Sequence, residues 1–385
     1  VSATSATKTT RYLQSITIPC AEQGVTLTNA HFKDNRAALN GGAMATPDNY
    51  KNTFFQLNNI TFQNNTAGNK GGALRISGPQ TAAHISDSTF DSNTASNSGG
   101  ALSIEASAGL QMFRIKGSNN HVTGAGDGGF LYSKFSNPIL ISEATIEKSA
   151  TTKQGGGGAF AVFSSKIALE RVIVERCQAG TSGGGALLLN GEAEAHVFDI
   201  MLDDNIATFG GSGGHIRAVA STLILHNKDV AMTWPSKKPM FPQEVTLKSS
   251  IGNVMTRSIA AGTGGAVSCM ASLSSKVLAT FNDKDQGLLS CQSNLYTYTT
   301  PITRYICPSN GVYFGTGTKI NRSTAKEDGG AISATLCSIE MFETSITNST
   351  SITGNGGALL LSSKSTLMVD QFSKFTNNTA VQGSG

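Results

Sequence analysis

Two adjacent carboxylates, Asp203 and Asp204, precede His215 and Arg217 by about one dozen residues in a chain with few charged groups. Paired carboxylates beside a histidine and a cation can perform acid–base cleavage of a glycosidic bond. Whether they do so depends on the elements that hold them. The two aspartates fill the variable positions of an L-x-x-N pattern that recurs along the chain. We therefore expect solvated carboxylates at a corner of the fold.

The recurring unit places a large apolar residue, most clearly phenylalanine, three residues before an asparagine and nine residues before a Gly-Gly pair. Seven of the nine gaps between successive Gly-Gly markers span 27 to 30 residues, and the other two span 51 and 65. We read the long gaps as one or two further units with insertions, which gives about twelve or thirteen coils in all. The predicted ladder residues are Phe32, Asn35, Phe62, Asn65, Phe90, Asn93, Phe375 and Asn378. The predicted corner glycines are Gly41, Gly42, Gly71, Gly72, Gly99, Gly100, Gly264, Gly265, Gly329, Gly330, Gly356 and Gly357.

Short apolar runs of β type lie between these markers, and no stretch shows helical periodicity. The sequence predicts an all-β fold, a single right-handed parallel β-helix with about 27–30 residues per coil and two insertions. Coils would stack at ~4.8 Å, so that equivalent residues form an apolar ladder and an asparagine ladder. Glycine at the corners allows a positive φ.

Three regions depart from the repeat. Three prolines near Trp234 interrupt any regular strand, and we expect this stretch to form a contact loop. The predicted organisation is a leader and cap strand at 1–30, regular coils at 31–224, an insertion loop at 225–262, coils with a cysteine-rich insertion at 263–340, and terminal coils at 341–385 that end in mid-repeat.

The composition excludes several classes of function. The net charge of +4 is dispersed along the chain, so we expect no nucleic-acid partner. No apolar run is long enough for a transmembrane segment. The six histidines and six cysteines lack metal-ligand spacing, and we expect no metal and no cofactor. Cys177 falls at the asparagine position of the repeat and is expected to be a buried thiol.

Cysteines and glycosylation sequons together favour an extracellular, oxidising location, at the cell surface or after secretion. The disulfide candidates, whose pairing the sequence leaves open, are Cys269, Cys291, Cys307 and Cys337. The N-glycosylation candidates are Asn59, Asn64, Asn321, Asn348 and Asn377.

The F-x-x-N motif followed by G-G-A-[I/L/V] resembles the repeats of the polymorphic outer-membrane proteins of chlamydiae. The resemblance runs from Phe32 to Ala358, with Phe62, Asn65 and Ala73 in one of its clearest copies. It implies a β-helical passenger of the autotransporter type that acts as a surface adhesin.

A polysaccharide-degrading β-helix enzyme is a further alternative. The set around Asp203 and His215 is similar to elements of polygalacturonase-like hydrolases, but Arg114-Ile-Lys116 lies upstream, in the wrong order, and Gly-His-Gly is missing. We expect no enzymatic activity. The favoured function is an extracellular structural glycoprotein, a rigid rod with N-linked glycans that assembles head to tail with copies of itself into a fibre. The alternative is an adhesin that binds a host receptor or glycan through its insertion loops.

Overall fold

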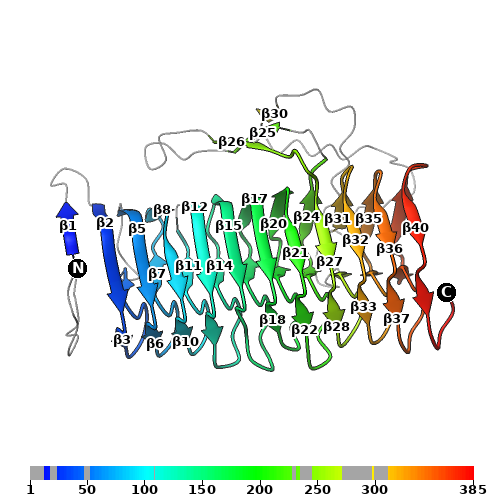
Figure 1. Ribbon diagram of the computed structural model, residues 1–385, viewed down its shortest axis with the longest axis horizontal. Helices are drawn as coiled ribbons and strands as arrows, with labels where there is room; N and C mark the ends of the chain where they lie inside the picture. The colour runs from blue at the N-terminus through cyan, green and yellow to red at the C-terminus, as the bar shows by residue number, and fades with distance from the viewer. Residues whose placement is uncertain are drawn as a thin grey trace.

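The computed structural model describes residues 13–17, 24–46, 53–107, 109–227, 231–234, 245–270, 297–298 and 311–385. These residues form strands β1 to β41 and no helix. Figure 1 shows the strands stacked side by side along the long axis of a rod, in chain order from β2 to β40. The predicted all-β parallel solenoid is confirmed.

Three long sheets form the walls of the rod, and each coil passes through them in the order A, B, C. Sheet A has 18 strands. They are β1 (Leu13–Thr17), β2 (Gly24–Lys33), β5 (Phe54–Gln63), β8 (Ala82–Ser86), β9 (Thr89–Asp91), β12 (Gly109–Ser118), β15 (Ile139–Glu147), β17 (Lys166–Glu175), β20 (Glu194–Phe198), β21 (Met201–Asp203), β24 (Thr222–Leu225), β27 (Val254–Thr256), β31 (Gly311–Phe314), β32 (Lys319–Asn321), β35 (Ser338–Met341), β36 (Ser345–Thr347), β39 (Thr366–Val369) and β40 (Lys374–Thr376).

Sheet B consists of short strands in two groups, which single bridges at Ala150 connect. Its strands are β3 (Arg36–Ala37), β6 (Thr66–Ala67), β10 (Thr94–Ala95), β13 (His121–Val122), β18 (Gln178–Ala179), β22 (Ile206–Ala207), β28 (Ile259–Ala260), β33 (Thr324–Ala325), β37 (Thr350–Ser351) and β41 (Thr379–Ala380). Sheet C has ten strands, β4 (Met44–Ala45), β7 (Leu74–Ser77), β11 (Leu102–Glu105), β14 (Leu131–Lys134), β16 (Phe160–Phe163), β19 (Leu187–Asn190), β23 (Ile216–Val219), β29 (Val267–Met270), β34 (Ile332–Thr335) and β38 (Leu359–Ser362).

The number of coils is smaller than the expected twelve or thirteen. Each strand of sheet C follows one Gly-Gly marker, and this sheet has ten strands. Strand β23 pairs directly with β29, and β29 pairs directly with β34. Each long gap in the sequence is therefore a single coil that carries an insertion, and neither gap holds an additional coil.

An apolar ladder fills the interior. The rings of Phe32, Phe62 and Phe90 stack at centroid distances of 5.2 and 4.9 Å. The next rung is Gly117, where an added Cβ would lie 2.7 Å from the ring of Phe130. Phe130 stands where most units have the alanine after Gly-Gly. The ring of Phe130 thus fills the space that the absence of a side chain at Gly117 leaves in the interior.

The Gly-Gly-Ala motif follows from backbone geometry. Gly71 has a φ of +65°, which side chains rarely tolerate. A Cβ on Gly72 would lie 2.0 Å from the carbonyl oxygen of Gly100 in the next coil. Ala73 points inward and is fully buried. The motif is therefore a requirement of a corner where the backbones of successive coils leave no room for a side chain.

The asparagine ladder joins successive coils by side-chain hydrogen bonds. Asn93 Oδ1 accepts from the backbone N and from Nδ2 of Asn65, at 3.1 and 2.9 Å. Asn93 Nδ2 donates to the carbonyl of Phe62 and to Asn120 Oδ1, each at 3.0 Å. Cys177 occupies the same position further along; its backbone N donates to Asn205 Oδ1, and burial raises the pKa of its thiol to about 12.

Replacement of Asn93 by alanine tests the ladder. Asn93→Ala would leave the buried amide of Asn65 and carbonyl of Phe62 without these partners, and we expect a loss of about 2–4 kcal/mol in the free energy of unfolding. The matched control is Asn97→Ala, because Asn97 is exposed and bonds only at the surface to Asn69. Urea denaturation of both variants measures the difference. Equal losses would contradict a structural role for the buried ladder.

Candidate functional site: the insertions docked on sheet A

The structure does not assemble the carboxylate–histidine–arginine set into one site. Asp203 accepts hydrogen bonds from Thr256 Oγ1 at 2.6 Å and Arg257 Nε at 2.8 Å on the outside of the rod. His215 points into the interior, and Arg217 lies on sheet C, where its Nη1 donates to the carbonyl of Ser182 at 2.8 Å. These side chains serve different contacts on different walls.

His215 is a neutral member of the interior. Its Nδ1 accepts from Asn205 Nδ2 at 3.1 Å, and its Nε2 donates to the carbonyl of Thr256 at 3.0 Å. Burial lowers the pKa of this imidazole to about 3, although the carbonyl bond and the charge of Asp203 act in the opposite direction. An uncharged, fully buried ring with both nitrogens bonded fits a structural role.

Within the described residues, no group of three or more His, Cys, Asp and Glu side chains is placed to hold a metal ion. The described residues also contain no helix long and apolar enough to cross a membrane.

The two insertions meet in one small antiparallel sheet. The first contributes β25 (Ala231–Trp234) and β26 (Val245–Lys248), and the second contributes β30 (Thr297–Tyr298). Figure 1 shows this sheet beside the edge of the rod near β24 and β31. The backbone of Trp234, the residue expected to mark a contact loop, pairs with Val245. No sequence pattern links these segments, because the pairing joins strands some 65 residues apart.

An apolar patch on the outer face of sheet A receives β26. Side chains alternate along a strand, and Leu140, Ala168 and Phe198 face outward from β15, β17 and β20. All three are fully buried, because Leu247 of β26 packs against them, and Val245 and Phe113 border the cluster. Burial of a leucine side chain stabilises by about 1.5–3 kcal/mol. The patch is the platform on which the first insertion docks.

Asp199 fastens the chain where it returns to the rod. Its carboxylate accepts from Ser249 Oγ at 2.8 Å and from the backbone N of Ser250, Ile251 and Gly252 at 2.7, 2.9 and 2.8 Å. Burial acts to raise the pKa of Asp199, but these hydrogen bonds outweigh it and hold the pKa below its usual value. We call this set of contacts the Asp199 clasp.

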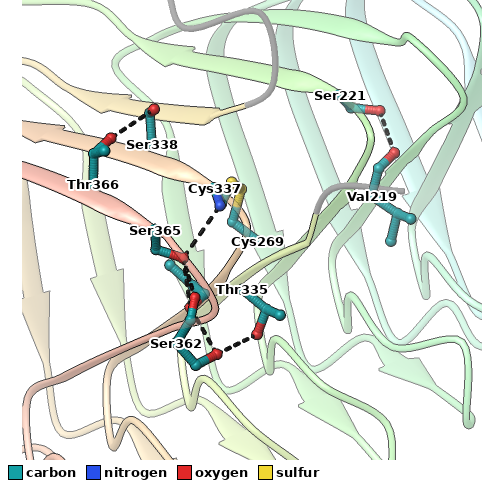
Figure 2. The surroundings of a disulfide bond; sticks show 10 residues. Val219, Ser221, Cys269, Thr335, Cys337, Ser338, Ser362, Ser365 and Thr366 are labelled. Atoms are coloured by element: carbon teal, nitrogen blue, oxygen red, sulfur yellow. Dashed lines mark hydrogen bonds between the residues drawn. A yellow bond between two sulfur atoms is a disulfide. The ribbon is translucent and has the colours of Figure 1, made fainter. Parts of the chain in front are cut away.

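A disulfide closes the base of the second insertion. Cys269 lies on β29, just before the chain leaves the rod, and it bonds to Cys337 in the next coil (Figure 2). Cys337 stands where neighbouring coils have a corner serine, and its backbone N donates to Ser365 Oγ at 3.2 Å. The other disulfide candidates, Cys291 and Cys307, lie outside the described residues, as does Cys20.

The sequons lie on the outside of the corners. Asn59, Asn64, Asn348 and Asn377 are exposed and have positive φ values between 53° and 54°. Asn321 is half-buried, and its Oδ1 accepts from Asn348 Nδ2 at 3.1 Å. Glycosylation of these residues stays a prediction.

The face of sheet A beneath the insertions also carries buried titratable groups. His196 Nδ1 lies 2.9 Å from His226 Nε2, and His196 Nε2 lies 2.7 Å from Glu194 Oε1. Burial acts to raise the pKa of Glu194, but the interactions with His196 and Lys166 outweigh burial and lower the pKa to about 2. Glu340 on β35 is 7 % exposed, its Oε2 makes no hydrogen bond with described residues, and burial raises its pKa to about 7. The sequence does not reveal these groups, because only the register of sheet A aligns them.

The Asp199 clasp can be tested with Asp199→Asn. The substitution keeps a residue that tolerates positive φ but replaces one accepting oxygen by a donor, so residues 249–252 should lose docking stability by roughly 1–2 kcal/mol. Hydrogen exchange at Ser250, Ile251 and Gly252 would accelerate, while exchange in the coils stays the same. The control is Asp87→Asn, at the equivalent corner, where the carboxylate bonds to exposed Arg114. Unchanged exchange in Asp199→Asn would contradict the clasp.

Glu340 predicts a defined pH dependence. A carboxyl group whose pKa rises on folding stabilises at pH values below its unfolded pKa, and this stability is lost as the pH rises through about 7. Glu340→Gln should therefore match the wild type at pH 4 and exceed its unfolding free energy at pH 8 by on the order of 3 kcal/mol. Exposed Glu343→Gln serves as the control. A gain of the same size at both pH values would show that ionisation of Glu340 is not responsible.

The repeat unit matches a known protein family. Residues 59–77 and 87–105 each match the Chlamydia polymorphic membrane protein repeat. The two stretches are equivalent parts of consecutive coils, from the strands of sheet A through the Gly-Gly corner to β7 and β11. No curated protein and no solved structure gives a significant match. The resemblance inferred from the motifs is thus confirmed at these two copies: the chain is a β-solenoid with two matches to the polymorphic membrane protein repeat.

Proposed function

We propose that the chain is a surface-exposed passenger rod that acts as an adhesin and presents its two insertions as one lateral binding module. The polymorphic membrane protein repeat supports a location at the cell surface. The observation that carries the proposal is the pairing of β25 with β30, because it joins insertions from different coils into one body. In this proposal the chain works by binding a receptor or glycan and has no catalytic role.

The attachments of the insertions favour a module that transmits force. Leu247 buries apolar surface on sheet A, Asp199 binds the returning backbone, and the Cys269–Cys337 disulfide ties the second insertion to the following coil. A load on the module would pass through these three points into several coils. The ladders then distribute it along the rod.

Removal of the insertions tests this function. The preceding coil supplies the template for both linkers. A single glycine can join His226 to Asn253, because Asp199 alone joins Phe198 to Ile200. Ala-Ser can replace residues 271–310, because Ala220 and Ser221 form the equivalent corner. We expect the doubly shortened rod to keep its circular dichroism spectrum and to lose binding to cultured cells and to immobilised glycans.

The matched control alters a different exposed feature, Phe209→Ser, on the loop between sheets B and C. This variant should bind as the wild type does. If the shortened rod binds cells and glycans with undiminished strength, the insertions are not the adhesive element.

A head-to-tail fibre of copies of this chain is the second candidate function and stays a prediction. Elongated particles in electron micrographs would support it, and single rods alone would exclude it.

A further inference from the structure

His226 borders the docking surface through its contact with Phe198. It directly follows β24, where the first insertion leaves the rod, and its side chain is fully buried. One face of its ring stacks on Phe198 at a centroid distance of 4.0 Å and an angle of 7°. Phe198 in turn belongs to the cluster that holds Leu247. A change at His226 is therefore transmitted through one aromatic ring to the docked strand β26.

We propose that protonation of His226 undocks residues 245–253 from sheet A, so that mild acid releases the first insertion while the rod stays folded. The proposal is independent of what the insertions bind, because it concerns only the contact between this segment and the rod.

The described carboxylates near His226 bind partners other than His226. His196 lies between His226 and Glu194, and Glu194 Oε2 forms an ion pair with Lys166 of β17 at 2.7 Å. Glu170, also on β17, accepts from Ser142 Oγ at 2.7 Å and pairs with Arg171.

The neighbours on the other side are likewise engaged or apolar. On β31, the hydroxyl of Tyr313 donates to Asn227 at 3.1 Å. From the docked segment, Val245 and Leu247 present apolar groups, and the carboxylate of Asp199, which binds this segment, is held in its clasp. A second proton on His226 would thus place a cation in a fully buried environment whose described carboxylates already bind other groups, where a buried charge is costly.

The direction of the pH effect follows from linkage. Burial, and then the neighbouring charge of His196, hold the pKa of His226 well below its ordinary value of 6.5. A histidine of this kind contributes stability above the unfolded pKa, and the contribution falls as the pH drops below it. One such group weakens docking about tenfold between pH 7.5 and pH 5.5. The Asp199 clasp responds to a lower pH range, because its pKa lies below 3.8.

Hydrogen exchange measured on the full chain tests the proposal. After correction for intrinsic rates, the protection of the Ser250, Ile251 and Gly252 amides reports the docking equilibrium. In the wild type we expect about a tenfold loss of protection from pH 7.5 to pH 5.5. Protection at Asn65 and Asn93 in the ladder should not change. Constant protection of the docked segment over this range would overturn the proposal.

Two substitutions identify the group. His226→Gln and His226→Phe cannot take up a proton, and the phenylalanine preserves the stack on Phe198, so either variant should keep its protection at pH 5.5. His121→Gln, on sheet B, is the matched control and should respond to acid as the wild type does. A full tenfold loss in the His226 variants would refute the role of this ring.

If neither variant folds, the wild type still decides the question. Exchange of the imidazole C2 hydrogen, read by mass spectrometry, follows the titration of His226. The proposal requires His226 of the docked protein to titrate with a pKa well below 6.5 while amide protection falls between pH 7.5 and pH 5.5. A pKa of His226 that is not shifted from 6.5 would overturn it.

Discussion

The in-register stacking of parallel coils is the constraint on which the structure depends. Neighbouring strands in a sheet lie ~4.8 Å apart, so every residue meets its counterpart from the coils before and after it. Each interior position of the repeat must therefore hold a side chain that can pack against, or form hydrogen bonds with, the same side chain in the next coil. Phenylalanine does so by stacking, and asparagine does so because its amide both donates and accepts. The repeated motif is the sequence record of this requirement.

The exceptions to the repeat show the same constraint. Phe130 replaces an alanine, and Gly117 in the facing position supplies the space. Cys337 replaces a corner serine where the preceding coil opens into the second insertion. Asp199 occupies a corner where equivalent residues pair with the next coil, but there it binds the returning backbone of the first insertion. Residues at repeat positions that elsewhere bind the next coil thus hold the insertions on the rod.

The sequence predicted the parts of the fold that repeat and missed the parts that occur once. Spacing predicted the solenoid, since the period and the Gly-Gly corner follow from stacking, and the resemblance of the F-x-x-N and G-G-A motifs indicated the family of the repeat. It overestimated the number of coils, because a gap of 51 or 65 residues does not reveal whether the chain adds a turn or leaves the rod.

The candidate site was harder to predict for the same reason. Trp234 stands out in the sequence because prolines lie near it and it is the one tryptophan. The contacts of Leu247, Asp199 and His226, however, join residues that share no period. The outward apolar residues of sheet A appear in the sequence as ordinary strand residues. Only the register reveals that Leu140 and Ala168 are neighbours and form one patch with Phe198.

The first insertion is docked on the outer face of sheet A through the apolar cluster that Leu247 forms with Leu140, Ala168 and Phe198. A double-mutant cycle with Phe198→Ala and Leu247→Ala, measured as free energies of unfolding, tests it most directly. The account predicts a coupling energy of about 1 kcal/mol or more between the two positions. Strict additivity, within about 0.3 kcal/mol, would contradict it.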